Sequence, residues 1–461
     1  MSKAEKIFVK ESYSKSFDLA HRKTIRFNMG KYDVSFKKGL SQFSDLQKAK
    51  DIASAKKQDV VDNLKTYLLE FENNCIKNGG EVIWAETGED AVNTVLEIFK
   101  QNNVKTVVKS KSMTTEEIEL NQALENSDIE VVETDLGEYI VQVAGEKPYH
   151  IVTPAMHKSK EDVAELFNEK FGTPINSTPE ELTLFVREKL RKKFITADAG
   201  ISGGNFLIAD TGAVALTENE GNGLMSVSMP KIHIAIVGME KIIPSIRDLH
   251  NFWSILSAHG TGQKISAYSS IFSGAKFSNE KDGPEKMYVI LLDNGRTDLY
   301  QKKEINTALK CIRCGACLNH CPIYKNIGGY TYDAVYTGPI GSVISPHYNG
   351  FKEYKHLSYA CTVCGKCTEI CPVEIDLHNL LLLNRKEAVE KGYDKTAWKI
   401  GMKGFEKGLS NRNMMDIVNG DLKNTGFNIA GKKMWGEERK FPGFAKKSFS
   451  KQWKNKESDK N

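Results

Sequence analysis

The pattern of apolar and polar positions begins with a helical segment. Residues 60–76 place Leu68, Phe71 and Cys75 at spacings of three and four, and Gly79-Gly80 follows. These spacings put apolar side chains on one helix face, and a glycine pair ends a helix. We therefore expect residues 1–80 to form a helical N-terminal region in which Cys75 is a buried structural thiol.

From residue 81 to about residue 300, short β-branched runs alternate with amphipathic segments. The expected strands are residues 82–85, 105–109, 130–133, 150–153 and 232–237. The expected helices are residues 89–101, 114–126, 159–170 and 178–194, the second of them opened by Thr114 with Glu117 in the capping-box position. This alternation predicts an α/β domain with a largely parallel sheet.

Polar glycine clusters punctuate the second half of this region. They lie at residues 198–214, 217–223, 238–241, 260–263 and 293–296. Open α/β sheets bind ligands beyond the carboxyl ends of their strands, so such clusters are suited to a binding crevice. The alternative is that they are hairpins and tight turns that need glycine. Because none completes G-x-G-x-x-G, a Rossmann dinucleotide site is disfavoured.

Eight of the nine cysteines fall in two copies of one pattern, each followed by a proline, Pro322 or Pro372. The pattern, C-x2-C-x2-C-x3-C-P, is typical of proteins with two 4Fe-4S clusters, in which the fourth cysteine of each run binds the other cluster. The spacing assigns one cluster to Cys311, Cys314, Cys317 and Cys371, and the other to Cys361, Cys364, Cys367 and Cys321.

Zinc and disulfides are the other uses of such cysteines. Structural zinc needs four ligands in well-separated pairs, and two overlapping sets of four fit that poorly. Disulfides need an oxidising compartment, which nothing in the sequence suggests. Helical patterns at residues 304–310 and 377–391 flank the cysteine runs. We therefore expect residues 301–392 to form a mainly α-helical two-cluster ferredoxin domain.

Composition narrows the classes of partner. The 461 residues include 64 Lys and Arg against 59 Asp and Glu, a net charge of +5, so no nucleic-acid partner is expected. The start has no secretory signal and the longest apolar runs are too short for a transmembrane segment, so we expect a cytoplasmic protein. Basic charge and aromatic side chains gather in residues 430–461, the end of a C-terminal extension at 393–461. We expect this tail to be an extended arm that docks on a surface.

Several motifs occur in order before the cysteine runs. They are Lys109-Ser-Lys-Ser-Met113, Glu133-Thr-Asp-Leu-Gly-Glu-Tyr139, Pro154-Ala-Met-His157, Ile201-Ser-Gly-Gly-Asn-Phe206, Ala209-Asp-Thr-Gly212 and Asn219-Glu-Gly-Asn-Gly223. With the helical lead and the two-cluster domain, they resemble the lactate utilisation protein B family over nearly the whole chain. The resemblance implies that residues 81–300 form a LUD-type α/β domain with an isomerase/CoA-transferase-like fold.

The resemblance also implies a function. The chain is expected to be an iron–sulfur subunit of a three-protein system that oxidises L-lactate, with a cysteine-rich-repeat subunit and a second LUD-domain protein as partners. A small carboxylate is the implied class of substrate. The matched motifs place eight candidate residues near a pocket: Lys109, Ser112, His157, Asp198, Asn205, Asp210, Glu220 and Asn222.

Two other functions stay open at this stage. Hydride removal from a 2-hydroxy acid releases two electrons together, so a flavin or equivalent must divide them, and we expect it on a partner. Whether the chain is itself an enzyme is therefore undecided. It could be a stand-alone CoA-transferase-like or isomerase-like enzyme with structural or sensory clusters, with Glu220 as the candidate nucleophile. It could equally be a scaffold that only relays electrons.

Overall fold

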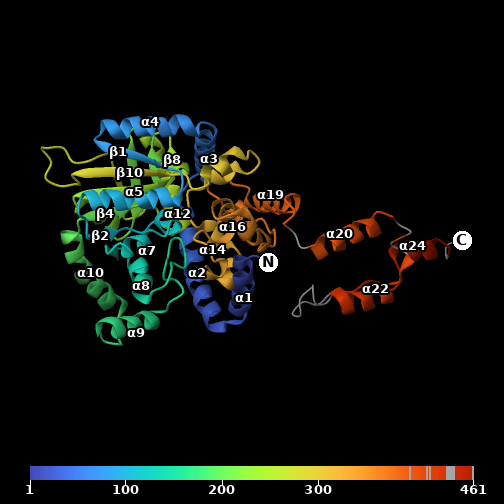
Figure 1. Ribbon diagram of the computed structural model, residues 1–461. Coiled ribbons are helices and arrows are strands. Elements are labelled where there is room, and N and C mark those ends of the chain that lie inside the picture. The colour runs from blue at the N-terminus through green and yellow to red at the C-terminus, as the bar shows by residue number, and fades with distance from the viewer. Residues whose placement is uncertain (394–395, 412–413, 415–416, 432–441, 459–461) are drawn as a thin grey trace. The chain divides into compact units, whose positions relative to one another are not determined.

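The computed structural model describes residues 1–393, 396–411, 414, 417–431 and 442–458 (Figure 1). The chain divides into a main unit, Met1–Ala388, and a C-terminal unit, Val389–Asn461. Among the described residues, no helix combines the length and apolar character that crossing a lipid bilayer requires.

The N-terminal region is helical, as predicted. Its helices are α1 (Lys3–Phe17), α2 (Leu19–Leu40), α3 (Leu46–Asp62) and α4 (Leu64–Lys77). The first three begin where Ser2, Asp18 and Asp45 accept a backbone N–H, which satisfies a donor that the first turn leaves free. Helix α4 ends before Gly79, which has a left-handed φ of 79°. Cys75 is fully buried on α4, and burial raises the pKa of its thiol to about 11.

The central sheet has six parallel strands in the order β1-β10-β7-β4-β2-β3. The strands are β1 (Gly80–Ala85), β2 (Thr106–Lys109), β3 (Glu130–Glu133), β4 (Ala199–Ser202), β7 (Ile232–Gly238) and β10 (Lys286–Leu292). Successive side chains of β7 alternate between the two faces: Ile234 and Ile236 pack with α5 (Gly88–Gln101) on one, and Ala235 and Val237 pack with α4 on the other. The predicted α/β class with a parallel sheet is confirmed.

Helices cover both faces of this sheet, and Figure 1 shows β1 and β10 between α4 and α5. The helices of this region are α5 (Gly88–Gln101), α6 (Met113–Glu117), α7 (Leu120–Glu125), α8 (Leu136–Ala144), α9 (Lys160–Phe171), α10 (Pro179–Thr196), α11 (Asn222–Ser228) and α12 (Leu249–Gly260). A second, smaller sheet has the order β8-β5-β6-β9. Its strands are β5 (Phe206–Ile208), β6 (Ala213–Glu218), β8 (Ile242–Ile243) and β9 (Tyr268–Phe272), and single-turn helices η1 (Met239–Lys241) and η2 (Ile246–Asp248) flank β8.

The cysteine-rich region is built from short helices and loops. It contains α13 (Arg296–Gln301), η3 (Asn306–Lys310), α14 (Ala316–His320), α15 (Tyr324–Ile327), η4 (Tyr330–Tyr332), α16 (Gly338–Tyr348), α17 (Phe351–Tyr354), η5 (Lys355–Tyr359), α18 (Lys366–Glu369) and α19 (Leu377–Glu390). One hydrophobic core joins Ile25 of α2, Phe252 of α12 and Leu318 of α14. The cysteine-rich region therefore packs tightly on the rest of the main unit.

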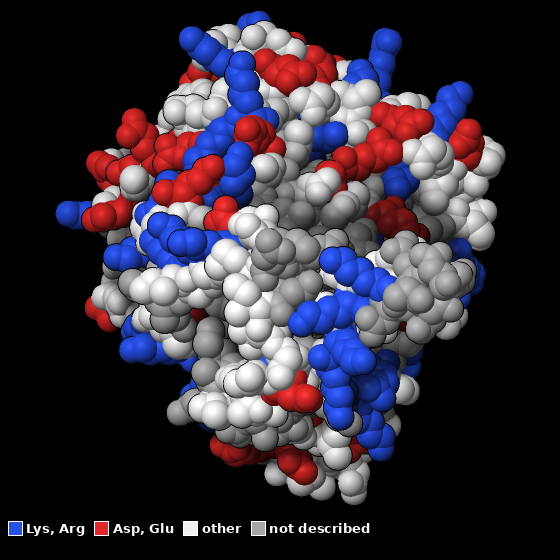
Figure 2. All heavy atoms as spheres, turned by 90° about the vertical axis from the view of Figure 1, so that its right-hand side faces the viewer, with Lys and Arg blue, Asp and Glu red and all other residues white. Residues whose placement is uncertain are grey.

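The C-terminal unit contains helices in its described part: α20 (Thr396–Leu409), α22 (Gly420–Gly426), the π-helix η6 (Phe427–Gly431) and α24 (Phe449–Ser458). The prediction that the tail is an extended arm was wrong for residues 449–458, which are helical. Residues 432–441 and 459–461 of the predicted tail lie outside the described residues. Over the upper part of the face in Figure 2, acidic and basic side chains are interspersed, in keeping with the small net charge.

Three local predictions also differ from the structure. Ser112, not Thr114, caps the helix after β2, and that helix divides into α6 and α7 at Glu119, whose φ is 51°. Residues 150–153 form no strand, because the buried His150 ring accepts the backbone N–H groups of Val152 and Thr153 and folds the segment into a turn. Residues 304–310 form the 3-10 helix η3 only from Asn306 onward.

Candidate metal centres

The two cysteine runs have the same backbone conformation. In the first, Arg313 and Gly315 have left-handed φ angles of 60° and 80°, and in the second Val363 and Gly365 have 54° and 76°. A β-branched residue such as Val363 is rarely found in this region, and such strain persists where function requires it. The repeated geometry indicates that both runs are shaped around the same kind of ligand.

Backbone N–H groups point at the cysteine sulfurs. The N–H of Arg313 donates to Cys311 Sγ at 3.4 Å, and the N–H of Val363 donates to Cys361 Sγ at 3.2 Å. Donors of this kind stabilise negative charge on sulfur, and hydrogen bonds to sulfur are one of the ways a protein tunes an iron–sulfur cluster.

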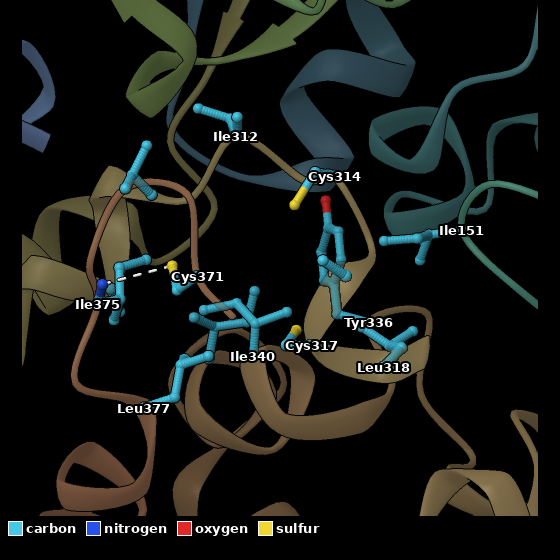
Figure 3. Packing of buried hydrophobic residues seen from close by; sticks show 14 of the residues in the cluster. Ile151, Ile312, Cys314, Cys317, Leu318, Tyr336, Ile340, Cys371, Ile375 and Leu377 are labelled. Atoms are coloured by element: carbon cyan, nitrogen blue, oxygen red, sulfur yellow. Dashed lines mark hydrogen bonds between the residues drawn. The ribbon is translucent and has the colours of Figure 1, made fainter. Parts of the chain in front are cut away.

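The first thiol set is Cys311, Cys314, Cys317 and Cys371. Burial raises the pKa of the Cys317 thiol well above its ordinary value, and the neighbouring Cys311, Cys314 and Cys371 raise it further. Burial likewise raises the pKa of Cys371 to about 11, with Cys311 adding to the effect. Figure 3 shows the sulfurs of Cys314, Cys317 and Cys371 facing one space among apolar side chains, with the N–H of Ile375 donating to Cys371 Sγ at 3.4 Å.

The second thiol set is Cys321, Cys361, Cys364 and Cys367. Burial raises the pKa of Cys367 to about 12, and the neighbouring Cys321, Cys361 and Cys364 contribute. Burial raises the pKa of Cys321 to about 11, and Cys361 and Cys364 contribute there as well. The structure thus brings together the same two groups of four that the sequence spacing assigns.

The donor set fits two iron–sulfur clusters. Four thiols are the ligand number of one 4Fe-4S cluster, and eight thiols make two such sets. Burial raises the pKa of Cys314, Cys317, Cys321, Cys367 and Cys371, so their thiolates are unfavourable by themselves, and a positively charged metal group would hold them deprotonated.

The two sets differ in exposure. Cys314, Cys317 and Cys371 of the first set are all buried, whereas in the second set Cys364 is exposed and Cys361 is half-buried. The first set therefore lies inside the main unit, and the second lies nearer the solvent.

The first set lies beside the carboxyl end of the central sheet. Glu240, just after β7, accepts from Arg296 Nε at 2.5 Å and from Arg313 Nη2 at 3.2 Å. Arg313 belongs to the first cysteine run, so Glu240 joins the sheet edge to the cluster region directly. The two arginines hold the pKa of this fully buried carboxyl down, at about 2, against the effect of burial.

Two buried lysines complete this junction. Lys57 of α3 donates from Nζ to the backbone oxygens of Glu240 at 2.5 Å and Ile242 at 3.1 Å, and burial lowers its pKa to about 7. Burial lowers the pKa of Lys241 to about 8, and the neighbouring Cys311 opposes both shifts. Lys57, Lys241 and Arg313 therefore lie near Cys311 of the first thiol set.

Three predicted pocket residues gather where β2 and β3 end. Lys109 is fully buried, with Nζ 2.8 Å from Glu133 Oε1 and 3.4 Å from Glu116 Oε1. Ser112 caps α6, and Asn222 Nδ2 donates to Thr134 Oγ1 at 3.4 Å. The ammonium group of Lys109 is already bound by carboxylates, so it is a structural cation in this structure.

Glu220 and His157 are each held by other contacts. Glu220 Oε2 accepts the N–H of Leu136 at 3.0 Å, and desolvation together with Asp135 raises the pKa of Glu220 to about 7. A nucleophilic carboxylate should be ionised and unengaged, so this geometry does not favour the CoA-transferase alternative. His157 Nε2 lies 2.8 Å from Glu146 Oε2, and its ring stacks on Tyr149.

The other three candidates support turns. Asn205 Oδ1 accepts the N–H of Thr217 at 2.8 Å, and Asp210 Oδ1 accepts the N–H of Ile246 at 3.0 Å. Asp198 precedes β4 and accepts the N–H groups of Lys105 and Thr106, at the amino end of the strands. The structure does not bring Asp198 or Asp210 to the group around Lys109.

The sequence reasoning missed the residues that join sheet and cysteines: Lys57, Glu117, Glu240, Arg296 and Arg313. The strand-end segments 238–241 and 293–296 carry a signal, because each places charged side chains beside a glycine. Gly238 shows why glycine is needed there, since a Cβ would lie 2.3 Å from Glu240 Oε2 and 2.6 Å from Arg296 Nε.

Comparison with protein families gives two matches. Residues 68–292 match the LUD domain, and residues 307–375 match the 4Fe-4S dicluster domain. The cysteine-rich region is therefore an iron–sulfur domain, and the α/β region is a LUD domain.

Curated relatives cover most of the chain. Lactate utilization protein B of Bacillus cytotoxicus is 41% identical over 89% of this chain and 89% of its own length. The proteins of the same name from Bacillus licheniformis and Bacillus subtilis are each 45% identical, over 78% and 77% of this chain and 76% and 74% of their own lengths. Among solved structures, a DUF162 family protein from Deinococcus radiodurans is similar at a TM-score of 0.29, with 14% identity over 50% of this chain and 98% of that chain.

Proposed function

The chain belongs to the lactate utilization protein B family, and from this membership we propose that it is the iron–sulfur electron-transfer subunit of a multi-protein system that oxidises L-lactate to pyruvate. The observation that carries the proposal is the placement of the two thiol sets. One is buried beside the carboxyl end of the LUD sheet, and the other includes the exposed Cys364. An internal centre and a peripheral centre together suit a protein that passes electrons between its interior and a partner at its surface.

The residues have distinct roles in this proposal. The first thiol set holds one 4Fe-4S cluster and the second set holds the other, with Cys371 and Cys321 exchanged between the two runs. When bound, the clusters supply one-electron carriers. Buried basic side chains near Cys311, among them Lys57, Lys241 and Arg313, offset the negative charge that four thiolates bring.

The chemistry of lactate oxidation argues for partners. Removal of hydride delivers two electrons together, whereas a cluster of this class carries one at a time, so a two-electron acceptor such as a flavin is required. We place that acceptor on a partner, and the cysteine-rich-repeat subunit and the second LUD-domain protein are the proposed companions. A small carboxylate bound by the LUD domain is compatible with this division.

The test is anaerobic purification and reconstitution of the full chain. About eight irons and eight acid-labile sulfides per chain are expected. Dithionite should bleach the brown chromophore, yet lactate with an artificial dye should give no turnover. Stoichiometric zinc without a chromophore would overturn the cluster assignment. Turnover of lactate by the isolated chain would move the catalytic site into residues 81–300.

A further inference from the structure

The side chain of Arg313 is buried, and two of its guanidinium nitrogens have no hydrogen-bond partner among the described residues. This side chain is 9% exposed, and its Cζ atom lies 4.4 Å from the centre of the Tyr336 ring. One nitrogen, Nη2, donates to Glu240 Oε1 at 3.2 Å. Its Nε and Nη1 atoms are also buried, and neither has a hydrogen-bond partner among the described residues. Leaving a buried charged donor unpaired is costly, so an acceptor is expected beside these atoms.

Besides Glu240, the first thiol set is a source of negative charge near Arg313. Cys311 lies close enough to the guanidinium to favour its charged form. The backbone N–H of Arg313 already donates to Cys311 Sγ at 3.4 Å. Main chain and side chain of one residue therefore both approach the same cysteine-bound group.

We propose that Arg313 donates its Nε–H and Nη1–H groups to sulfur atoms of the cluster held by Cys311, Cys314, Cys317 and Cys371, and thereby raises that cluster's reduction potential. This inference rests on the proposed electron-transfer function. Reduction adds one electron and one negative charge to the cluster, no bond is broken and no proton is required. A fixed cation in a low-dielectric interior stabilises the reduced form more than the oxidised form.

The second cysteine run offers an internal comparison. Val363 occupies the place equivalent to Arg313, with a similar left-handed φ and the same N–H···S bond from its backbone to Cys361. Its side chain is apolar and carries no donor. The two clusters therefore differ at this place by one buried cation, and Arg313 is a positioning residue for the first cluster only.

The experiment is a redox titration of the reconstituted full chain, followed by electron paramagnetic resonance, for wild type, Arg313→Gln, Arg313→Lys and Val363→Gln. Arg313→Gln should shift the one-electron equilibrium of one cluster at least tenfold toward its oxidised form, which is about 59 mV. The other cluster should keep its potential. Arg313→Lys keeps the charge without the fork of donors and should shift the same cluster by less.

Val363→Gln is the matched control and should leave the first cluster unchanged. An unchanged potential in Arg313→Gln with full iron content would overturn the inference, and so would equal shifts of both clusters. If Arg313→Gln loses iron, the lysine variant decides: a potential equal to that of wild type contradicts the role of the donors. Failure of the wild-type chain to hold any cluster would instead overturn the proposed function.

A second feature, independent of Arg313, lies beside the other thiol set. A cavity of about 420 Å³ is lined by Arg22, Arg26 and Asp33 of α2 and by Pro322, Lys325 and Asn326. Lys325 pairs with Asp33 at 3.2 Å, which leaves the two arginines as excess positive charge. Pro322 directly follows Cys321 of the second set, so the cavity lies against the more exposed centre.

Helix α2 extends this basic surface. It carries six Lys and Arg against a single acidic residue, Asp33. Its outer face also exposes large apolar side chains, with Leu19 at 75%, Phe27 at 62% and Val34 at 72%. Arginine mixed with exposed apolar side chains is typical of protein interfaces. The charge requires an acidic partner, and it disfavours the chain's own tail, residues 430–461, which has ten Lys and Arg against four Asp and Glu.

We infer that α2 and the cavity beside Pro322 are the docking surface for an acidic electron-transfer protein, which exchanges electrons with the cluster of the second thiol set. One electron passes between the docked redox group and that cluster, with no proton or bond transferred. Attraction between the acidic partner and Arg22, Arg26 and their neighbours raises the rate of encounter and weakens as salt is added.

The test uses a reduced plant-type 2Fe-2S ferredoxin, an acidic protein, as the probe of the oxidised, reconstituted full chain. The double variant Arg22→Glu/Arg26→Glu should accept electrons at least tenfold more slowly at low ionic strength, and the difference should shrink in high salt. The control Arg191→Glu/Lys192→Glu, on α10, reverses two charges on a helix that contributes nothing to the cavity.

Small reductants separate a docking surface from a simple anion site. Reduced methyl viologen, a cation, should not be slowed by Arg22→Glu/Arg26→Glu. If dithionite, a small anion, is slowed as much as the ferredoxin, the cavity attracts small anions only and the docking inference is wrong. Equal loss of rate in the α10 control would also contradict it, because net charge alone would then explain the effect.

Discussion

Arg296 and Glu117 lie 179 residues apart in the sequence and form a buried bidentate ion pair. Arg296 Nη1 lies 2.8 Å from Glu117 Oε1, and Nη2 lies 2.8 Å from Oε2. The two side chains are 0% and 2% exposed, and the Tyr336 hydroxyl donates to the same carboxylate at 2.6 Å. The pair fastens α6 of the LUD domain to α13, the helix that leads toward the first cysteine run.

The first prediction concerns this pair. Glu117→Gln should lower the free energy of unfolding by about 3–5 kcal/mol, because it leaves the buried guanidinium of Arg296 without one of its carboxylates. Urea unfolding of wild type and variant with equal iron content measures the difference. A loss below about 1 kcal/mol would show that Glu240 alone suffices to hold Arg296.

An exposed ion pair supplies the control. Lys193 and Glu130 pair on the surface, with side chains 36% and 53% exposed. Exposed pairs contribute little because solvent and salt screen them, so Glu130→Gln should change stability by less than about 1 kcal/mol. If both variants lose the same amount, burial is not what makes the Arg296 pair strong.

Periodicity predicted the elements that form the core. The spacing of Leu68, Phe71 and Cys75 indicated α4, and the β-branched run at residues 232–237 indicated β7. Both signals come from side chains that must be buried, so the pattern is local. The start of α6 was misplaced because Ser112 and Thr114 are equally plausible caps, and only the contacts after β2 distinguish them.

The sequence alone identifies the cysteine ligands but not the buried ion pairs. The two cysteine runs can be recognised because cluster ligands need fixed spacing. No such rule links Glu117 to Arg296 or Glu240 to Arg313, since these partners meet only after the sheet and the cysteine-rich region have packed together. The role of Lys109 could not be predicted for the same reason. Its charge suggested a ligand site, but in the folded protein its ammonium group is bound by carboxylates.

The second prediction tests the exchange of ligands between the runs. Cys371 lies in the second run, but its thiol is close to Cys311 and Cys317. Cys371→Ser should therefore alter the cluster of the first run and spare that of the second, because the serine oxygen replaces one of its four sulfurs. Electron paramagnetic resonance of the reduced protein distinguishes the two signals.

The mirror variant provides its control. Cys321→Ser should alter the cluster at Cys361, Cys364 and Cys367 and leave the first cluster intact, since these four thiols are neighbours. If each variant instead disturbs the cluster of its own run, the ligands are not exchanged and the assignment must be reversed.

The third prediction concerns Glu138, a carboxyl buried near Lys109. Burial, and then the neighbouring Glu133, raise the pKa of Glu138 well above its usual range. Carboxylate oxygens of Glu138, Glu133 and Glu116 lie within 4.8 Å of one another. Glu138 therefore stays protonated to a higher pH in the folded protein than in the unfolded chain, where it ionises near pH 4.3.

The shifted pKa of Glu138 makes the stability of the folded protein depend on pH. Above the unfolded pKa the folded state binds more protons at Glu138 than the unfolded state, so this residue lowers stability as pH rises. Glu138→Gln removes that proton dependence. The variant should match wild type at about pH 4 and gain stability at higher pH, by up to about 1.4 kcal/mol per pH unit.

Urea unfolding of the reconstituted chain at several pH values, compared with the same series for Glu125→Gln, measures the effect. Glu125 is exposed and should give parallel curves for variant and wild type. A Glu138→Gln variant that becomes less stable than wild type as pH rises would mean that the folded protein uses the ionised carboxylate, for example to bind a cation.

The last prediction concerns the C-terminal unit. All eight cysteines of the two thiol sets lie within Met1–Ala388, so deleting residues 430–461 should leave about eight irons per chain.

Helix α24 carries Phe449 and Trp453 at 72% and 53% exposure, with ring centres 5.6 Å apart. Aromatic side chains held on the outside of a basic helix are suited to contact another protein. The deletion should therefore reduce recovery of the partner subunits when the tagged chain is purified from cells. Substituting Phe449 and Trp453 by serine should have the same effect without shortening the chain. If iron content falls with the deletion, the tail supports the cluster region, and if partner recovery is unchanged, the subunits assemble through the main unit alone.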